Sequence, residues 1–150
     1  MGRWAKWILP AILMLLVLIQ VIPINRSNPE PDNKKSIFAV ETVPPSLKLV
    51  FNRSCGDCHS DQTKWPWYSY VAPVSWIVAS DVHGARKHLN LSEWGDYTSK
   101  QREEALEDMC EQVQQGDMPQ KKYVLVHRDA KLKQSERDAI CRWTEAARQY

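Results

Sequence analysis

The feature that most constrains this 150-residue chain is the pentapeptide Cys55-Gly56-Asp57-Cys58-His59. Its two thiols stand about one helical turn apart, so both can face the same side of the backbone. At that spacing two thiols can form thioether bonds with the two vinyl groups of a haem, and the histidine that follows can bind the iron. The sequence therefore predicts one covalently attached haem c per chain, with His59 as an iron ligand.

Two other kinds of site use a C-x-x-C pair, namely thiol-exchange sites and zinc sites. A zinc site of this kind needs a second pair at similar spacing, whereas the remaining cysteines, Cys110 and Cys141, lie far apart. The strand–motif–helix order of a thioredoxin-like site is also missing around Cys55. Haem is the preferred interpretation, and zinc binding and thiol exchange are the alternatives.

An apolar segment opens the chain. Residues 7–24 are interrupted only by two prolines and one glutamine, and as a helix they would extend about 27 Å, close to the thickness of a bilayer core. Arg3 and Lys6 precede them and favour a cytoplasmic amino end, which exports the remainder. No A-x-A pattern ends the segment, so we predict an uncleaved single-pass anchor over residues 1–24; a cleaved signal peptide and a buried core helix are the alternatives.

The rest of the chain divides into a polar, proline-bearing linker over residues 25–44 and a haem domain over residues 45–150. A loosely ordered linker is the preferred interpretation, and docking of the apolar patch Ile37-Phe38-Ala39-Val40 on the domain or the membrane is the alternative. Apolar residues recur at helical spacing before Cys55, after Pro73 and, most clearly, between Thr98 and Gly116. Thr98 with Gln101 forms a capping-box pattern, and Gly116 is a typical helix stop.

A final helix is expected to begin near Ser135, which with Asp138 would form its cap. The short apolar run at residues 123–126 is expected to be an extended segment or a buried loop. The predicted fold class is all-α: a cytochrome-c-like helical haem domain with long loops, preceded by one transmembrane helix.

The second axial ligand is predicted to be Met118, in the loop Gly116-Asp117-Met118-Pro119. Its soft thioether suits ferrous iron, and Met/His ligation raises the reduction potential. The alternative is a methionine that fills a gap in the core. Among the histidines, His127 is the main rival ligand, while His83 and His88 are expected on the surface of a helix.

Cys110 and Cys141 each fall on a predicted helix, and outside the cytoplasm they can pair. We predict a disulfide that braces the two helices; a small buried thiol at Cys110 is the alternative. The net charge is only +2, and charges balance from Pro45 onward. No basic stripe follows the chain, so a nucleic-acid partner is not expected.

Beyond the motif, the chain resembles a family of small bacterial haem-binding domain proteins that have one C-x-x-C-H. The matching stretches span most of residues 46–145; they are Cys58-His59-Ser60, residues 63–69, 72–76 and 89–94, Gly116-Asp117-Met118-Pro119, and residues 123–127 with 129–132. The resemblance implies covalent haem, a cytochrome-c-like domain and a role in the cell envelope. It carries over Cys55, Cys58, His59 and Met118 as cofactor-binding residues, and His127 also falls on its pattern.

The chain departs from that pattern at two places. Lys133 stands where many members have Ser or Thr as a helix cap, and Asp81 and Ala85 stand where many have His-x-x-x-Gly. Any role of that second region is therefore not carried over.

Together these features predict a membrane-anchored electron carrier rather than an enzyme. Its haem domain would face the periplasm, or the extracytoplasmic side, and exchange single electrons with envelope redox proteins. The alternative function is a haem-based sensor, or a haem protein that reacts with small ligands or peroxide. The sequence does not specify an oligomeric state.

Overall fold

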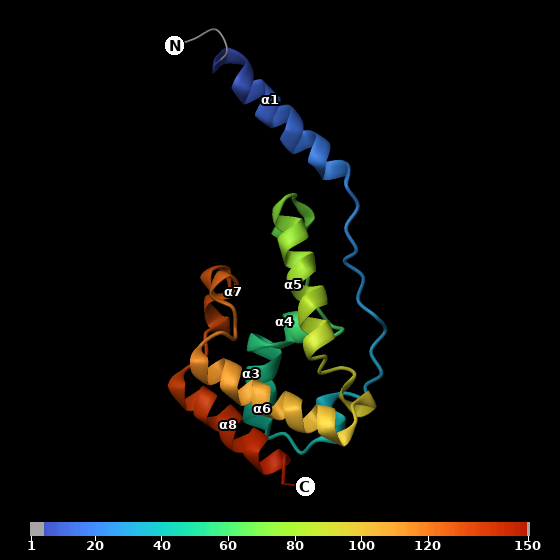
Figure 1. The fold of residues 1–150 in the computed structure, drawn as a ribbon, viewed down its shortest axis with the longest axis vertical. Helices are drawn as coiled ribbons and strands as arrows, with labels where there is room; N and C mark the ends of the chain where they lie inside the picture. Colours follow the sequence, from blue (N-terminus) through green and yellow to red (C-terminus); the bar gives the residue numbers. More distant parts are fainter. Residues whose placement is uncertain (1–4, 150) are drawn as a thin grey trace.

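The computed structural model describes residues 5–149, and within them every regular element is helical, without a strand (Figure 1). The predicted all-α class is confirmed. The α-helices and the 3₁₀ turns, labelled η, follow the chain in this order: α1 Ala5–Leu18, η1 Ile19–Val21, α2 Ile37–Val40, α3 Pro45–Ser54, α4 Gly56–His59, η2 Trp67–Tyr70, α5 Val74–His88, η3 Trp94–Asp96, α6 Ser99–Gln115, α7 Lys121–Val126, η4 Arg128–Ala130 and α8 Gln134–Ala147.

Helix α6 begins and ends at the residues that the sequence indicates. The Thr98 hydroxyl accepts the Gln101 N–H at 3.3 Å, and the Gln101 side chain accepts the Thr98 N–H at 2.9 Å, which completes the predicted capping box. Gly116 follows the last turn with φ 77°, a left-handed conformation that glycine adopts without a side-chain clash. The loop that carries Met118 therefore begins at a defined helix end.

The core lies where α3, α6 and α8 meet. Leu106 and Val113 of α6 are buried against Ile140 of α8, and the Phe51 ring of α3 meets the Trp143 ring edge-on at 5.4 Å between centroids. Burial of large apolar side chains is the main favourable term in folding, so the contact among these three helices contributes most to the stability of the domain.

A disulfide joins two helices of that core. Cys110 of α6 and Cys141 of α8 are bonded, with their Cα atoms 4.7 Å apart. The predicted disulfide is thus confirmed.

The cap of α8 differs from the prediction. The helix begins one residue before Ser135, and its N-cap is Lys133, whose N–H donates to the Glu136 carboxylate at 2.8 Å. The lysine side chain has no acceptor, so it cannot replace the hydroxyl of a Ser or Thr cap. The expected cap of Ser135 with Asp138 was wrong, because Glu136 supplies half of a capping box two residues earlier.

The apolar run at residues 123–126 also differs from the prediction. It is part of the short helix α7 and none of its residues is fully buried. Tyr123 turns inward, whereas Leu125 and Val126 are 75% and 60% exposed. The prediction of an extended segment or a buried loop was therefore wrong. The segment is a short helix, which places Tyr123 on its inner side and Leu125 and Val126 on its outer side.

The amino-terminal segment leaves the domain as helix α1, which extends away from the other helices (Figure 1). Its apolar side chains, such as Leu9 and Met14, are exposed. Within residues 5–149, none of the helices combines the length and the apolar character that crossing a membrane requires. Arg3 of the predicted anchor lies outside the described residues.

The predicted linker packs on the domain over part of its length. The Ile37 side chain is fully buried, and its N–H donates to the Leu91 carbonyl at 2.8 Å. Gly95 lies so close that a Cβ there would come within 3.0 Å of the Lys35 Cα. This part of the segment is therefore not a loose tether, because Ile37 belongs to the same buried core as Trp94.

Candidate cofactor site

The C-x-x-C-H motif lies at the junction of α3 and α4. Cys55 closes α3 through its N–H, which donates to the Phe51 carbonyl at 2.9 Å, and α4 then contains Cys58 and His59. The His59 N–H donates to the Cys55 carbonyl at 2.9 Å. One turn of helix therefore carries both thiols and the imidazole, as the spacing predicts.

The imidazole of His59 is oriented by the segment that follows α5. Its Nδ1 lies 3.0 Å from the Leu89 carbonyl oxygen, and the Leu91 N–H donates to the His59 carbonyl at 2.7 Å. A carbonyl only accepts, so Nδ1 holds the proton and Nε2 keeps its lone pair. This second hydrogen bond is the usual support of a histidine that binds a metal.

Two adjoining cavities of about 500 Å³ each flank the motif, and we refer to the pair as the groove. Cys58 lines the first cavity, Cys55 lines the second, and His59 and Met118 line both. The volumes fall within the roughly 300–1,000 Å³ typical of small-molecule and cofactor sites. All four predicted cofactor-binding residues therefore meet at one mostly apolar groove, a setting that fits a flat hydrophobic macrocycle.

The surroundings of the motif favour the neutral forms of its two thiols and its imidazole. Burial raises the pKa of Cys55 to about 12, and burial with the nearby Asp57 and Asp81 carboxylates raises the pKa of Cys58 to about 11. Thiol exchange uses the thiolate, so these raised pKa values disfavour that alternative. Burial lowers the pKa of His59, although hydrogen bonds to backbone carbonyls oppose the shift, and a neutral imidazole is the form that binds iron.

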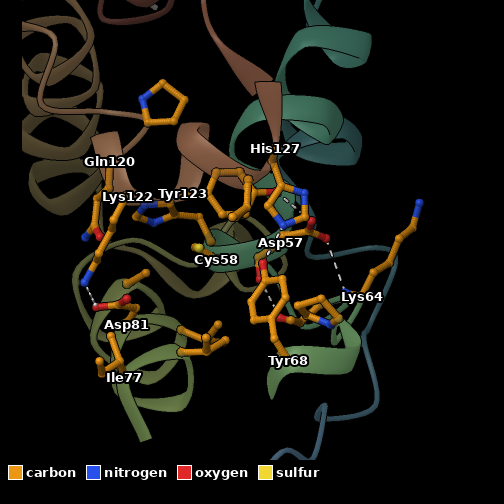
Figure 2. Close-up of a pocket in the computed structure, with 18 of the residues that line it drawn as sticks. Asp57, Cys58, Lys64, Tyr68, Ile77, Asp81, Gln120, Lys122, Tyr123 and His127 are labelled. Carbon is orange, nitrogen blue, oxygen red and sulfur yellow. Dashed lines mark hydrogen bonds and ion pairs between the residues drawn. The ribbon is translucent and has the colours of Figure 1, made fainter. Parts of the chain in front are cut away.

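A polar network borders the first cavity (Figure 2). The Tyr68 hydroxyl and His127 Nε2 lie 2.6 Å apart, and Tyr123 stacks on the His127 ring at 4.3 Å between centroids. The Tyr123 hydroxyl donates to the Asp57 carboxylate at 2.8 Å, and that carboxylate also accepts the Lys64 N–H at 3.2 Å. The middle of the C-x-x-C-H motif is thereby tied to α7 and to the loop before η2.

An ion pair closes the other side of the same cavity. Lys122 Nζ lies 2.7 Å from the Asp81 carboxylate and links α7 to α5 (Figure 2).

Asp57, Tyr68 and Tyr123 were not among the predicted site residues. One signal was present: Tyr123 and His127 stand four residues apart, the spacing that stacks side chains on one face of a helix. The contact of Tyr68 with His127 had no such signal, because it joins residues far apart in the chain.

The rival ligands occupy different surroundings. His127 lines the first cavity, but its Nε2 is engaged by Tyr68. His88 is exposed at the end of α5 beside the second cavity, and His83 is half-buried on the same helix. Met118 lies on both cavities, and its N–H donates to the Gln112 carbonyl at 3.1 Å, which fixes the backbone there.

Within residues 5–149, no three His, Cys, Asp or Glu side chains are grouped so that they could hold a metal ion by themselves. Cys110 and Cys141 are joined to each other, so they add no ligands to Cys55 and Cys58.

Comparison with known proteins agrees with this geometry. The model of the haem-binding domain family matches residues 14–146, which include the whole groove and all of the predicted linker. Neither a curated protein nor a solved structure gives a significant match. The chain, whose motif, groove and sequence all indicate the same cofactor, therefore belongs to the haem-binding domain family.

Proposed function

We propose that this protein is a membrane-anchored mono-haem c-type cytochrome that carries single electrons between redox proteins of the cell envelope. The observation that carries the proposal is the meeting of Cys55, Cys58, His59 and Met118 at one groove. A bound haem would supply one-electron chemistry through its iron.

The residues of the chain divide the work of holding the cofactor. Cys55 and Cys58 would each form one thioether bond to a vinyl group and so make attachment permanent. His59 would bind the iron through Nε2, since the Leu89 carbonyl engages Nδ1. Met118, from the loop after α6, would be the second axial ligand and favour the ferrous state.

The apolar lining would exclude water from the groove. The carboxylates nearest the motif are already engaged: Asp57 accepts from Tyr123, and Asp81 pairs with Lys122. This arrangement favours electron transfer over enzymatic catalysis.

The envelope location is supported by two features. Helix α1 presents exposed apolar side chains, which an apolar phase would cover. The Cys110–Cys141 disulfide is typical of proteins outside the cytoplasm. We propose that α1 associates with the cytoplasmic membrane and that the haem domain lies on its outer side.

The test is a pyridine haemochrome spectrum of the denatured full chain, made in a host that attaches haem to cytochromes of this type. We expect haem to stay with the wild-type polypeptide and to be extracted from the double variant Cys55→Ser/Cys58→Ser. The matched control is Cys110→Ser/Cys141→Ser, which removes two cysteines away from the motif and should retain the haem. A wild-type chain with the mass of the bare polypeptide would refute covalent attachment.

One observation favours a second function, the binding of a small ligand at the haem. Tyr68 and His127 form a hydrogen-bonded pair on the first cavity, and such polar groups can donate to an iron-bound ligand. This function needs a free or labile sixth position. Carbon monoxide that binds the ferrous wild type as readily as it binds ferrous Met118→Ala would favour this function over the electron carrier, because only an open or labile sixth position admits the ligand.

A further inference from the structure

The domain exposes a cluster of large apolar side chains at one end. They come from η2 and the residues after it, from the start of α5, and from the end of α7. We name this cluster the apolar rim, and its members are Trp67, Tyr70, Val71, Val74, Ile77, Leu125 and Val126. Trp67, Val74, Ile77 and Val126 also line the first cavity of the groove, so the rim borders the mouth of the candidate haem site.

The exposure of the rim is concentrated rather than scattered. Trp67 is 79% exposed and Leu125 is 75% exposed. In the described part of the domain after residue 22, the only large apolar side chains of comparable exposure outside the rim are Val40 and Leu49. Single exposed apolar residues are ordinary, but a cluster at one end of a domain indicates a surface that another apolar phase covers.

The rim is attached to the end of the apolar amino-terminal segment. The Gln20 side chain donates to the Ala72 carbonyl at 3.1 Å and accepts the Ala72 N–H at 2.9 Å. Six residues later, the Arg26 guanidinium lies 4.4 Å from the centroid of the Tyr70 ring and donates to the Ser69 carbonyl at 3.3 Å. These contacts hold the point where α1 and η1 end against the loop between η2 and α5.

The arrangement of the helices places the apolar rim on the same side of the domain as α1. The amino end of α5 and the helix α7 project toward the side from which α1 leaves the domain (Figure 1). The apolar helix and the apolar rim therefore occupy the same end of the molecule, and a single apolar phase can cover both.

We propose that the apolar rim rests in the interfacial layer of the same bilayer that receives α1, so that the mouth of the first cavity faces the membrane. The inference rests on the proposed membrane association of α1 and adds an orientation to it. Trp67 and Tyr70 are the ring types that are enriched at membrane–water interfaces. Arg26 beside Tyr70 and the exposed Lys64 at the cavity provide cations for headgroup phosphates.

The consequence is a haem site presented to the membrane surface. Redox partners embedded in the same membrane would then approach the haem without detaching the domain from the lipid. The opposite end of the domain, with the paired helices α6 and α8, would face the aqueous compartment.

The test compares two exposed leucines. Leu125 belongs to the rim, whereas Leu49 lies on α3 outside it, and they are 75% and 71% exposed. Full-length, haem-loaded Leu125→Cys and Leu49→Cys proteins are added to preformed vesicles of phosphatidylcholine and phosphatidylglycerol. Each new thiol is then alkylated with a charged, membrane-impermeant maleimide. The native cysteines should not interfere, because two would be thioether-bound and two form a disulfide.

We expect the new thiol of Leu125→Cys to react about tenfold more slowly on vesicles than the new thiol of Leu49→Cys, since an apolar setting raises the thiol pKa by a unit or more and the thiolate is the reactive form. Complete denaturation in detergent should make the two rates equal, which controls for intrinsic reactivity. A Trp67→Cys protein should behave like Leu125→Cys. The haem absorbance of each variant reports that the domain is folded.

Two results would overturn the proposal, and they differ in what else they refute. Equal alkylation rates on vesicles that carry the protein in a flotation gradient would refute the membrane-facing rim while leaving the anchoring intact. Failure of the wild-type chain to float with the vesicles would refute both the anchoring and the rim.

Discussion

At the scale of single residues, His59 and Met118 illustrate how local hydrogen bonds prepare a site. His59 is held from both sides by the segment Leu89 to Leu91, through its ring and through its carbonyl. Met118 is held through its backbone N–H by the carbonyl of Gln112 in the last turn of α6. These hydrogen bonds fix the backbone of both residues, so both side chains are positioned at the groove by the protein itself.

The role of Met118 is testable by substitution with leucine, which keeps the volume and removes the sulfur. We expect Met118→Leu to lose the low-spin spectrum and to lower the reduction potential by on the order of 0.1 V, within the roughly 0.8 V range that axial ligands control. Absorbance and potentiometric titration measure both effects. The control is Met14→Leu, an exposed methionine of α1 far from the groove in the chain. An unchanged spectrum in Met118→Leu would exclude the sulfur as a ligand.

Glu136 makes the stability of the folded state depend on pH. Burial alone would raise its pKa, but the Lys133 N–H and the Arg53 guanidinium outweigh burial and lower the pKa below its ordinary value of 4.5. A carboxylate with a lowered pKa stabilises the fold above its unfolded-state pKa, and this contribution is lost as the pH falls through the folded-state pKa.

We therefore expect the free energy of unfolding of the wild type to fall more steeply below pH 4.5 than that of Glu136→Gln. Urea titrations near neutral pH and at about pH 3 measure the difference. Glu103→Gln, at an exposed position of α6, is the control and should retain the wild-type slope. Parallel pH profiles for the wild type and Glu136→Gln would contradict the assignment.

At the scale of secondary structure, the paired helices α6 and α8 form the surface on which α3 packs. Their contact contains buried side chains of both helices and the disulfide, and α3 packs on it through Phe51. Because α3 leads directly into Cys55, any loosening of this pair would be transmitted to the motif.

The disulfide is expected to contribute measurably to this support. Its two cysteines are 31 residues apart, and closing a loop of that size stabilises a folded protein by about 3–4 kcal/mol in the chain-entropy description. Cys110→Ala/Cys141→Ala should lower the free energy of unfolding by about that amount. Denaturant titration of the haem-loaded protein measures it. Adding a thiol reductant should destabilise the wild type and leave the double variant unchanged; an equal response of both would argue against the bond.

At the scale of the whole molecule, the amino-terminal segment is part of the domain rather than an appendage to it. Ile37 is buried in the core beside Trp94, and the Thr42 carbonyl accepts a hydrogen bond from the Trp143 ring at 3.1 Å. Farther upstream, Asn28 accepts from Arg86 at 2.8 Å. The segment therefore connects α1 to the domain through several fixed points.

This integration predicts a clear difference between two neighbouring positions. Ile37→Ala should cost about 2–5 kcal/mol of unfolding free energy, the usual range for a large aliphatic side chain removed from a core. Val40→Ala, on the exposed side of the same short helix, should change it by no more than about 0.5 kcal/mol. Equal and small effects at both positions, measured by denaturant titration, would show that the segment is a loose tether.

Much of the local structure could be predicted from the sequence because its causes lie within a few residues. The spacing of Cys55, Cys58 and His59 needs only one helical turn, and the cap at Thr98 and the stop at Gly116 act on their own helix. The all-α class follows from such local signals, whereas the haem-binding family was indicated by a resemblance along residues 46–145. The Cys110–Cys141 bond was predictable in part, because both cysteines fall on helices and few partners were available.

Other features depended on which segments meet in three dimensions. The contact of Tyr68 with His127, the hydrogen bond of Tyr123 to Asp57 and the clamp of Gln20 on Ala72 join residues far apart in the chain, and no local pattern encodes such pairs. The same reason explains why Ile37 was assigned to a linker: its burial is decided by Leu91 and Trp94, which only the folded chain brings to it. The sequence by itself thus determined the chemistry that the motif can perform, while the tertiary structure decided what surrounds the motif, because long-range packing depends on the whole fold.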